Sequence, residues 1–485
     1  MKAHTTIMLL LLATIPASAG VFDQFADIGE LTDHLNSGGP PRDGIPAMTN
    51  PEFVSLEVAS SWVRDTDLVV GVVRNGEAKA YPENLGWWHE IVNDRIGGEF
   101  VTVTLCPLTG TPQVFHATAA NGSQIEFGVS GLLINSNLVM YDRRDNETLY
   151  PQMVYTGING RFKGEQLELL PAIETTFAMW KKMYPESQVA QFGTGLERYS
   201  QQQSSKYQSA DRFAAYPYGD YRTNDGYFIA PVTTGRPDLS TYSAKEVITG
   251  ICLGDELRAY PFADMAPAAV INDTLGGHEL LVLFDLESRT SIPYSRVVDG
   301  QSLTFYQVQA EGDLPVEFRD VETGSRWDML GVAVDGALAG SRLEQLPSYN
   351  SMWFAWSTYW PESTIWETGD GIIEAPPPIT AVLEPATATV PVGFDLAQNH
   401  PNPFNPDTRI HFTLPVGGQM TLQIYNAAGQ RVRSLADGAH RAGVYDVTWD
   451  GTDGSGRRVA SGTYLYRLEM PGVGLRQGRS MTLAQ

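Results

Sequence analysis

Short runs in which apolar and polar residues alternate make up much of residues 51–372, and a period of two is typical of β-strands with one buried face. A run at residues 68–73 is followed by Asn75-Gly76 and by a second run at 77–81, the strongest short-range signal of a β-hairpin. Further strands are expected at residues 101–105, 113–116, 125–129 and 138–141. The pattern predicts a mainly β, α+β fold.

Two short stretches are expected to be helical. One covers residues 83–92 and carries His89, and the other is the apolar-periodic stretch 175–184. Residues 128–137 are rich in Gly, Asn and Ser and are interpreted as a turn between strands. A Tyr- and Gln-rich stretch at 199–221 is expected to be an exposed loop, with a lid as the alternative.

The same order of elements returns later in the chain. EVITGICLGDELRAYP at residues 246–261 matches DLVVGVVRNGEAKAYP at 67–82, an offset of 246 − 67 = 179, and VINDTLGG matches IVNDRIGG at the same offset. LPSYNSMWFAWSTYWPES at 346–363 matches LPAIETTFAMWKKMYPES at 170–187, an offset of 346 − 170 = 176. Self-similarity at a fixed spacing indicates an internal duplication.

The duplication predicts a core with pseudo-twofold symmetry. We expect a signal peptide at residues 1–19, an extended segment at 20–50, core copy one at 51–205, core copy two at 206–372, a Pro-rich linker at 373–391 and a separate domain at 392–485. The chemically distinctive residues differ between the copies: His89 aligns with Ala268, Glu90 with Ala269 and Cys106 with Asp285. We interpret copy two as a structural partner with a degenerate site, and ordinary divergence after duplication is the alternative.

Cys106 and His89 are the most distinctive residues of the core. An alternating run at 99–105 ends at Cys106, and Pro107 and Gly110 suit a type I turn directly after it. A strand end before a tight turn is a common place to present a reactive or ligating side chain. His89 lies two short turns upstream, so a hairpin can bring it near Cys106.

The motifs around these residues resemble a known family. WHEIVND, CPLTGT and, further on, GVSGLLINSNLVMYDR are similar to the bacterial family called domain of unknown function 3179, over residues 43–368. The usual turn motif of that family is CPLCGT, and Thr109 stands here in place of its second cysteine. The resemblance implies a family without implying a chemistry.

A metal site is the first hypothesis for the core. Cys106 and His89 are ligand types that suit copper or zinc, and Met140 and His116 lie downstream in copy one and are candidates to complete the set, as is Met153. Glu90 would orient a ligand and not bind the metal itself. The residues lack the compact spacing of a well-known metal motif.

Two other hypotheses stay open. The Cys-Pro-Leu-Cys of the family has the spacing of a redox pair, but Thr109 removes the second thiol, which leaves a lone Cys106 with His89 as base. Alternatively, the core is non-catalytic, and Cys106 is a buried free cysteine in a binding or scaffold module. Cys252 is the other cysteine, and the sequence does not decide whether the two pair.

Charge and the N-terminus indicate where the protein works. Lys+Arg 33 against Asp+Glu 56 gives a net charge of −23, which argues against nucleic acid as a partner. Lys2, the apolar residues 7–15 and Ala17-Ser18-Ala19 have the form of a signal peptide, and no later stretch predicts a transmembrane helix. We expect an exported, extracellular or cell-surface protein whose mature chain begins near Gly20.

The C-terminal residues differ in character from the core. Regular short strands separated by turn clusters predict an Ig-like β-sandwich over residues 392–485. QNHPNPFNP, IYNAAGQ, WDGTDGSG and VASGTYLYRL resemble the flagellar-hook-capping-type Ig-like domain and the C-terminal sorting domains of type IX secretion. The resemblance implies contact with secretion machinery or the cell surface.

Overall fold

The computed structural model describes residues 27–208, 213–234, 238–254, 256–265, 268–373, 393–416, 418–440, 443–454, 457–470 and 474–484. It divides into two compact units. Unit 1 comprises Met1–Ala268, Asp273–Ser295 and Gln345–Asp370, and unit 2 comprises Ala269–Asn272, Arg296–Glu344 and Gly371–Gln485. The expected signal peptide lies outside the described residues, as does the expected Pro-rich linker after residue 373. None of the helices in the described part is long and apolar enough to cross a membrane.

The first sheet of unit 1 contains the predicted hairpin. Its strand order is β12-β4-β5-β13-β3, with β3 (Phe53–Ser55), β4 (Leu68–Arg74), β5 (Glu77–Pro82), β12 (Ile173–Thr176) and β13 (Gln188–Ala190). β4 and β5 pair antiparallel around Asn75-Gly76, and both turn residues have positive φ. The predicted hairpin is therefore confirmed. The helix expected at 175–184 is α3 (Phe177–Met183), shorter than expected because Thr176 ends β12 and caps the helix.

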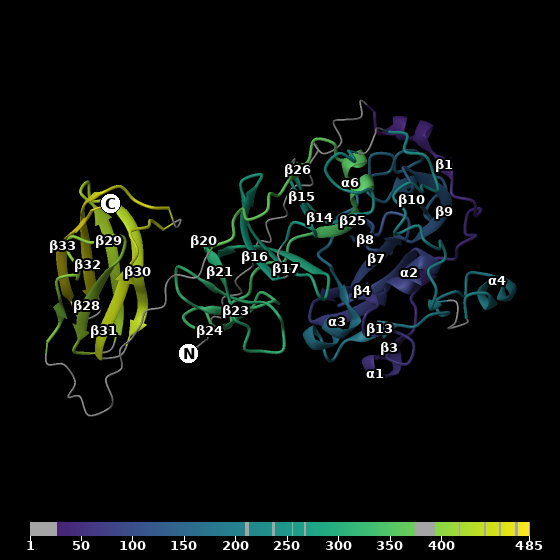
Figure 1. The fold of residues 1–485 in the computed structure, drawn as a ribbon. Helices are drawn as coiled ribbons and strands as arrows, with labels where there is room; N and C mark the ends of the chain where they lie inside the picture. The colour runs from purple at the N-terminus through teal and green to yellow at the C-terminus, as the bar shows by residue number, and fades with distance from the viewer. Residues whose placement is uncertain are drawn as a thin grey trace. The chain divides into compact units, whose positions relative to one another are not determined.

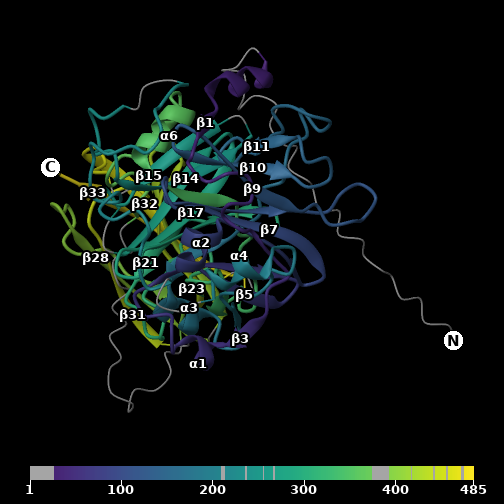
Figure 2. The same ribbon diagram turned by 90° about the vertical axis from the view of Figure 1, so that its right-hand side faces the viewer.

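Two further sheets build the first half of the core. One has the order β2-β6-β7-β8, with β2 (Met48–Thr49), β6 (Ile91–Ile96), β7 (Glu99–Cys106) and β8 (Thr111–His116). The other has the order β1-β9-β10-β11, with β1 (Asn36–Ser37), β9 (Phe127–Ile134), β10 (Asn137–Asp142) and β11 (Leu149–Pro151). Figures 1 and 2 show β9 and β10 side by side. The turn expected over residues 128–137 is wrong, because most of that stretch is strand β9 and only Asn135-Ser136 form the turn.

One helix positions the candidate residues. α2 (Glu83–His89) packs against β7, and the approach is close because Gly86 has no Cβ. A Cβ there would lie 2.5 Å from Leu105. The helix expected over 83–92 ends at His89, and Ile91 already begins strand β6.

The second half of the core has related sheets. They are β25-β14-β15-β26, with β14 (Val247–Leu253), β15 (Glu256–Pro261), β25 (Ser348–Met352) and β26 (Thr364–Ile365), and β16-β17-β18, with β16 (Ala268–Leu275), β17 (His278–Asp285) and β18 (Thr290–Ser295). These strands belong to unit 1 except for residues 269–272 of β16, which are assigned to unit 2. Unit 2 adds β21 (Phe305–Val308), β22 (Glu317–Asp320), β23 (Arg326–Asp328) and β24 (Ala333–Asp335). Helix α6 (Trp353–Tyr359) follows β25 and is buried along its whole length. The shorter elements are η2 (Ile28–His34), α1 (Leu56–Ala59), α4 (Gln201–Ser205), β19 (Val297–Val298) and β20 (Gln301–Ser302).

One close contact occurs in both halves. A Cβ on Gly71 would lie 2.0 Å from the ring of Trp180, and a Cβ on Gly250 would lie 1.9 Å from the ring of Trp356. The glycines are 250 − 71 = 179 residues apart and the tryptophans 356 − 180 = 176, which are the offsets of the sequence repeat. Each tryptophan therefore packs onto its sheet only because the strand beneath it carries glycine.

Buried hydroxyl groups join the two halves within unit 1. The Oγ1 atoms of Thr175 and Thr290 are 2.6 Å apart, and Thr111 Oγ1 donates to Ser351 Oγ at 3.3 Å. All four residues are fully buried. The hydrogen bonds fix the register of each half against the other, because a shift would leave buried hydroxyls unpaired.

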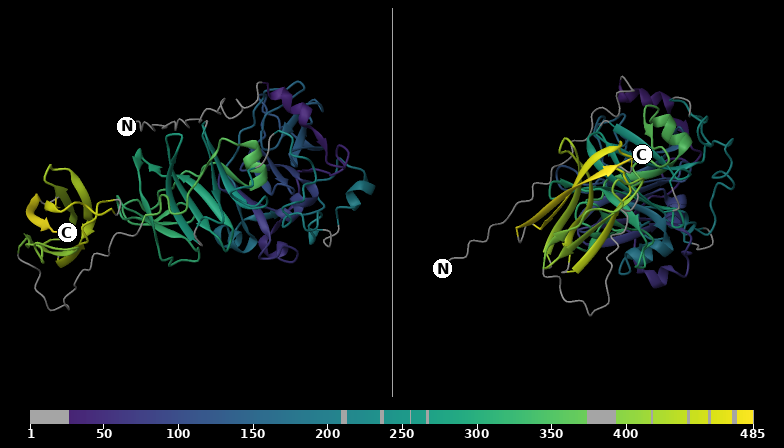
Figure 3. Two further views of the ribbon diagram at one scale, coloured as in Figure 1. Left: turned by 45° about the horizontal axis from the view of Figure 1, so that its top comes forward. Right: turned by 60° about the vertical axis from the view of Figure 1, so that its left-hand side comes forward.

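The C-terminal residues form a β-sandwich. One sheet has the order β27-β28-β31 and the other β30-β29-β32-β33, with β27 (Asp395–Leu396), β28 (Thr408–Leu414), β29 (Gly418–Asn426), β30 (Arg431–His440), β31 (Gly443–Trp449), β32 (Gly462–Met470) and β33 (Leu475–Leu483). Figure 3 shows its yellow strands from two further sides. Alternate residues such as Ile410, Phe412 and Leu414 point into the core between the sheets. The fold class predicted from the sequence, mainly β with a C-terminal sandwich, is confirmed.

Candidate functional site

Cys106 ends strand β7 and lies in the interior. It is 1% exposed, and its thiol donates to the carbonyl of Ser136 with an Sγ–O distance of 3.6 Å. Burial raises the pKa of the thiol, although a hydrogen bond with Thr109 opposes this shift. A buried neutral thiol of this kind is a poor nucleophile, because the thiolate is the reactive form.

The matching turn in the second half shows what this position does structurally. Asp285 ends β17 and is 5% exposed. Its carboxylate accepts from the backbone N of Ser288 at 2.9 Å and from the Ser288 hydroxyl. Ser288 corresponds to Thr109, since 288 − 109 = 179. In both turns the side chain at the strand end therefore bonds to the hydroxyl residue three positions later.

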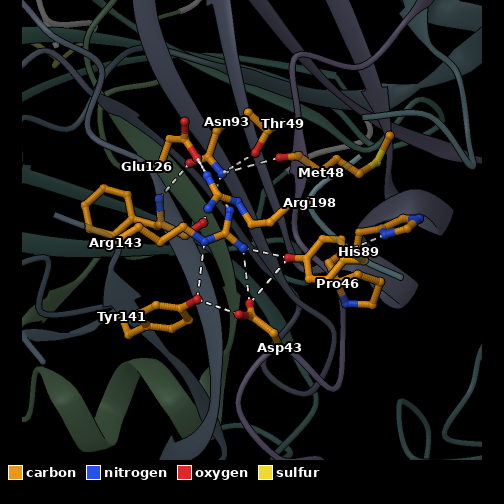
Figure 4. A network of polar contacts seen from close by, with 12 residues as sticks. Asp43, Pro46, Met48, Thr49, His89, Asn93, Glu126, Tyr141, Arg143 and Arg198 are labelled. Carbon is orange, nitrogen blue, oxygen red and sulfur yellow. Dashed lines mark hydrogen bonds and ion pairs between the residues drawn. The ribbon is translucent and has the colours of Figure 1, made fainter. Parts of the chain in front are cut away.

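His89 is the last residue of α2 and is fully buried. Its Nδ1 donates to the Pro46 carbonyl at 2.7 Å, a contact visible in Figure 4. Burial lowers the pKa of His89 to about 4, so the ring is neutral and Nε2 is an acceptor. Nε2 has no hydrogen-bond partner among the described residues, while the rings of Tyr207 and Phe213 lie 5.3 and 5.8 Å from the imidazole.

Glu90 caps α2 in a left-handed backbone conformation, with φ 59°. It is 8% exposed, and burial raises the pKa of its carboxyl to about 8. Its carbonyl accepts from the backbone N of Leu105 at 2.8 Å. A buried acid on a strained backbone is a feature often found at functional sites, although it also occurs in structural turns.

The predicted metal ligands are only partly brought together. The Glu90–Leu105 bond places the end of α2 beside the end of β7, but the His89 ring contacts Pro46 whereas the Cys106 thiol contacts Ser136. Among the described residues no group of three or more His, Cys, Asp or Glu is placed to hold a metal ion.

The structure places the other predicted ligands at different positions relative to Cys106. Met140 on β10 is buried in the same hydrophobic cluster as Cys106. His116 pairs with Val101 at the far end of the β7–β8 ladder from the Cys106–Thr111 pair, and its Nδ1 lies 4.0 Å from Glu168. Met153 is also buried, in a separate hydrophobic cluster. His116 therefore lies too far along the strand to bind the same metal ion as Cys106.

Residues 213–222 cover this part of the molecule, and the exposed loop expected over 199–221 holds for them only in part, because Ala214, Ala215, Gly219 and Asp220 are exposed. Phe213 is 2% exposed and Tyr221 is fully buried. The hydroxyl of Tyr216 donates to the Pro107 carbonyl at 2.8 Å, in the turn after Cys106. Burial is the largest cause that raises the pKa of Tyr218, and the nearness of Glu90 adds to it. This segment lies over the Cys106 turn as a cover, and the lid that the sequence offered as the alternative stays a prediction.

A second polar cluster, shown in Figure 4, ties the N-terminal segment to the segment that carries Arg198 and Tyr199. The Arg143 side chain is 6% exposed, and its Nη2 lies 3.1 Å from Asp43 Oδ1 and 2.6 Å from the Tyr199 hydroxyl. The Tyr141 hydroxyl donates to Asp43 Oδ2 at 2.6 Å, and Glu126 lies 3.7 Å from Arg143 Nη1. One guanidinium therefore ties three distant segments of the chain together.

The sequence reasoning missed a third polar cluster beside α2. Glu83 at the start of the helix is 3% exposed and forms a 3.0 Å ion pair with Arg222 at the end of the cover. Glu174 on β12 lies near enough for the charge of Glu83 to raise its pKa, after the larger effect of burial. No hydrophobic periodicity in the sequence marks Glu83, Glu174 or Arg222. The aromatic residues before Arg222 are the sequence signal that could have pointed to this cluster.

Comparisons with known proteins identify two regions. A family model described as "Protein of unknown function (DUF3179)" matches residues 42–363, and one described as "FlgD Ig-like domain" matches residues 407–471. A search of curated proteins finds no match.

Two solved structures from Porphyromonas gingivalis are similar at low levels. One is dimeric latent PorU, at 11% identity and a TM-score of 0.17, covering 86% of this chain and 34% of that one. The other is PorZ, an essential surface component of the type IX secretion system, at 10% identity and a TM-score of 0.16, covering 86% of this chain and 56% of that one. These scores are too low to assign a shared fold.

Proposed function

Since the chain belongs to the DUF3179 family, whose function is unknown, we propose that it is an exported, non-catalytic binding protein that works at the cell surface. Its ligand would bind in the first half of the core, beneath or beside the cover of residues 213–222.

One observation carries this proposal. Cys106 and Thr109 take the same places in their turn as Asp285 and Ser288 in the other half, where the carboxylate closes the turn by accepting from Ser288. The position therefore favours a side chain that closes the turn, and this supports a structural thiol over a reactive one. The bond between His89 and Pro46 supports the same interpretation for the imidazole.

Thiol labelling tests the proposal directly. In a Cys252→Ser variant, Cys106 is the one remaining cysteine of the two in the chain. Folded protein should resist a maleimide reagent, and unfolded protein should react completely, because the thiol is 1% exposed. Labelling of the folded protein at the rate of a free thiol would contradict the proposal.

A single copper or zinc ion remains a second candidate. The observation that favours it is the buried His89 Nε2, which has no partner among the described residues and could bind a metal with Cys106 and Met140. Glu90 would then orient a neighbouring ligand. Metal content should be equal and substoichiometric in wild type, Cys106→Ser and His89→Ala if the core is non-catalytic. Stoichiometric metal that both variants lose would favour the metal site.

Export rests on the two ends of the chain. The expected signal peptide at residues 1–19 would direct the protein out of the cytoplasm. The FlgD Ig-like domain at 407–471 would then engage secretion machinery or the cell surface. The net charge of −23 fits a soluble surface protein with no nucleic acid partner.

The proposal also includes an origin by duplication, with residues 51–205 and 206–372 as the two copies. The Gly71–Trp180 and Gly250–Trp356 contacts, at the offsets of the sequence repeat, support it. An experimental structure in which the two copies superpose strand by strand would be the expected result, and different strand orders would contradict it.

A further inference from the structure

The ion pair between Arg222 and Glu83 lies among aromatic rings. Arg222 Nη2 is 3.0 Å from Glu83 Oε2, and the guanidinium carbon lies 5.3 Å from the ring centre of Trp87 and 4.9 Å from that of Tyr216. The two rings touch edge to face at 5.3 Å. Two aromatic contacts and one ion pair hold the guanidinium in one orientation.

Two hydrogen-bond donors of this cluster are left over. Arg222 Nε and Trp87 Nε1 are buried and have no hydrogen-bond partner within the described residues. Neither group can accept a hydrogen bond. Because a buried donor without a partner costs about 1–3 kcal/mol, two such donors on neighbouring side chains indicate an acceptor that comes from outside the chain.

Glu174 adds a third group near the ion pair. It is 9% exposed, and its Oε2 also has no hydrogen-bond partner among the described residues. Burial and then the charge of Glu83 raise its pKa well above the usual value. Protonation of this carboxyl group would supply a third hydrogen-bond donor beside Trp87 and Arg222.

The charges around the cluster define the ligand further. Glu83 balances Arg222, and the charge of Arg289 acts on Glu174 as well. A positive guanidinium whose donors lie beside an indole N–H suits an acceptor-only anion such as a carboxylate. The Arg222 side chain is 28% exposed, so the cluster borders solvent.

We propose that Trp87, Glu174 and Arg222 form a binding site for the carboxylate group of a small monocarboxylate. We call this the Arg222 site. The carboxylate oxygens would accept from Arg222 Nε, Trp87 Nε1 and the Glu174 acid group. The inference rests on the proposed binding function and names the class of ligand.

The test uses the full-length protein with acetate, butyrate and benzoate as probes, and with the corresponding amides as uncharged controls. Binding is followed by calorimetry and by the NMR shift of the Trp87 indole N–H, assigned with Trp87→Phe. At least one carboxylate should bind and move this signal, and its amide should bind at least about 10-fold more weakly, equivalent to about 1.4 kcal/mol.

Matched variants separate the site from general effects. Arg222→Lys keeps the charge but removes Nε, and Trp87→Phe keeps the ring but removes N–H; each should weaken binding about 10-fold. Glu174→Gln remains neutral and keeps a donor, so it should bind nearly as wild type. Arg198→Lys, at a side chain that is 51% exposed in another cluster, should have no effect.

Any one of three results would overturn the Arg222 site. The first is equal binding of a carboxylate and its amide, and the second is unchanged affinity in both Arg222→Lys and Trp87→Phe. The third is that no probe binds in the millimolar range. These outcomes leave the labelling and metal measurements on Cys106 untouched. A failure of the Arg222 site is therefore distinguishable from a failure of the proposed function.

Discussion

Glu90 makes the stability of the protein depend on pH. Its pKa is 4.5 in an unfolded chain and about 8 in the folded protein, because burial disfavours the carboxylate. Between these values the folded state binds a proton that the unfolded state has released. Stability therefore falls as pH rises, by about 1.4 kcal/mol per pH unit from this group.

Replacing Glu90 by Gln should remove that slope. Compared with wild type, Glu90→Gln should gain stability steadily from pH 5 to pH 8 in urea unfolding experiments, and the two should converge below pH 4.5. Glu168→Gln, at a side chain that is 72% exposed, is the control and should follow wild type. Parallel profiles for Glu90→Gln and wild type would show that Glu90 is ionised in the folded protein.

The neighbourhood of Cys106 shows how far single residues can be predicted from sequence. The turns between His89 and Cys106 were sufficient to predict that the backbone returns on itself, and the Glu90–Leu105 bond is the outcome. The directions of the side chains were not predictable. They depend on Pro46 and on residues 213–222, which come from parts of the chain far from this hairpin in sequence.

The segments around Asp43, Glu126 and Tyr199 are held by one buried cation, Arg143, and this defines a prediction about their stability. Arg143→Leu would leave Asp43 without its ion-pair partner and Glu126 with Arg198 alone, while filling similar space. We expect a loss of about 2–3 kcal/mol, below the 3–5 kcal/mol of fully buried pairs because both carboxylates are partly exposed. Hydrogen exchange should quicken in the segments around Asp43 and Tyr199, which the guanidinium contacts.

Arg198→Ala supplies the matched control. Arg198 pairs with the same Glu126 at 2.6 Å, but its side chain is 51% exposed. Its loss should cost about 0–1 kcal/mol, as for other exposed ion pairs. Equal destabilisation by the two substitutions would mean that the cluster in Figure 4 does not hold the segments together.

The glycines beneath the two tryptophans give a paired test. Gly71→Ala and Gly250→Ala each place a Cβ about 2 Å from a buried indole ring, so both should destabilise the core by about 3 kcal/mol or more. Gly226→Ala is the control, because a Cβ there would meet a single atom at 3.7 Å. Thermal unfolding measures the stability of all three variants. A mild effect at Gly71 or Gly250 would show that the helix carrying the tryptophan, α3 or α6, can move away from the sheet.

Whole elements were predictable where local signals were strong. The Asn75-Gly76 turn signal predicted the β4–β5 hairpin, and the helical period of apolar residues predicted α3. Composition misled at residues 128–137, because Gly and Ser there lie in a strand covered on both sides, where small residues permit close packing. Gly128, for example, has the Tyr141 ring where a Cβ would lie, at 2.3 Å. Such contacts are set by tertiary partners and leave no pattern in the local sequence.

The C-terminal sandwich should separate from the rest of the chain. Its hydrophobic cluster is built from residues between Phe394 and Leu483, with none from the core. Deletion of residues 392–485 should leave the core folded, with cooperative unfolding and unchanged near-UV circular dichroism, but should prevent its delivery to the cell surface. Normal surface delivery of the truncated protein in cell fractionation would contradict the sorting role.

The hydroxyl contacts between the two halves have a consequence for the origin of the chain. By the repeat offsets, Thr290 corresponds to Thr111 (290 − 179) and Ser351 corresponds to Thr175 (351 − 176). Thr175 contacts Thr290, and Thr111 contacts Ser351, so each half presents the same two positions to the other. This reciprocity, in which position i touches j and j touches i, defines an isologous interface. If the duplication holds, the single-copy ancestor was a homodimer built on this contact, and fusion converted an association that depended on concentration into an intramolecular one.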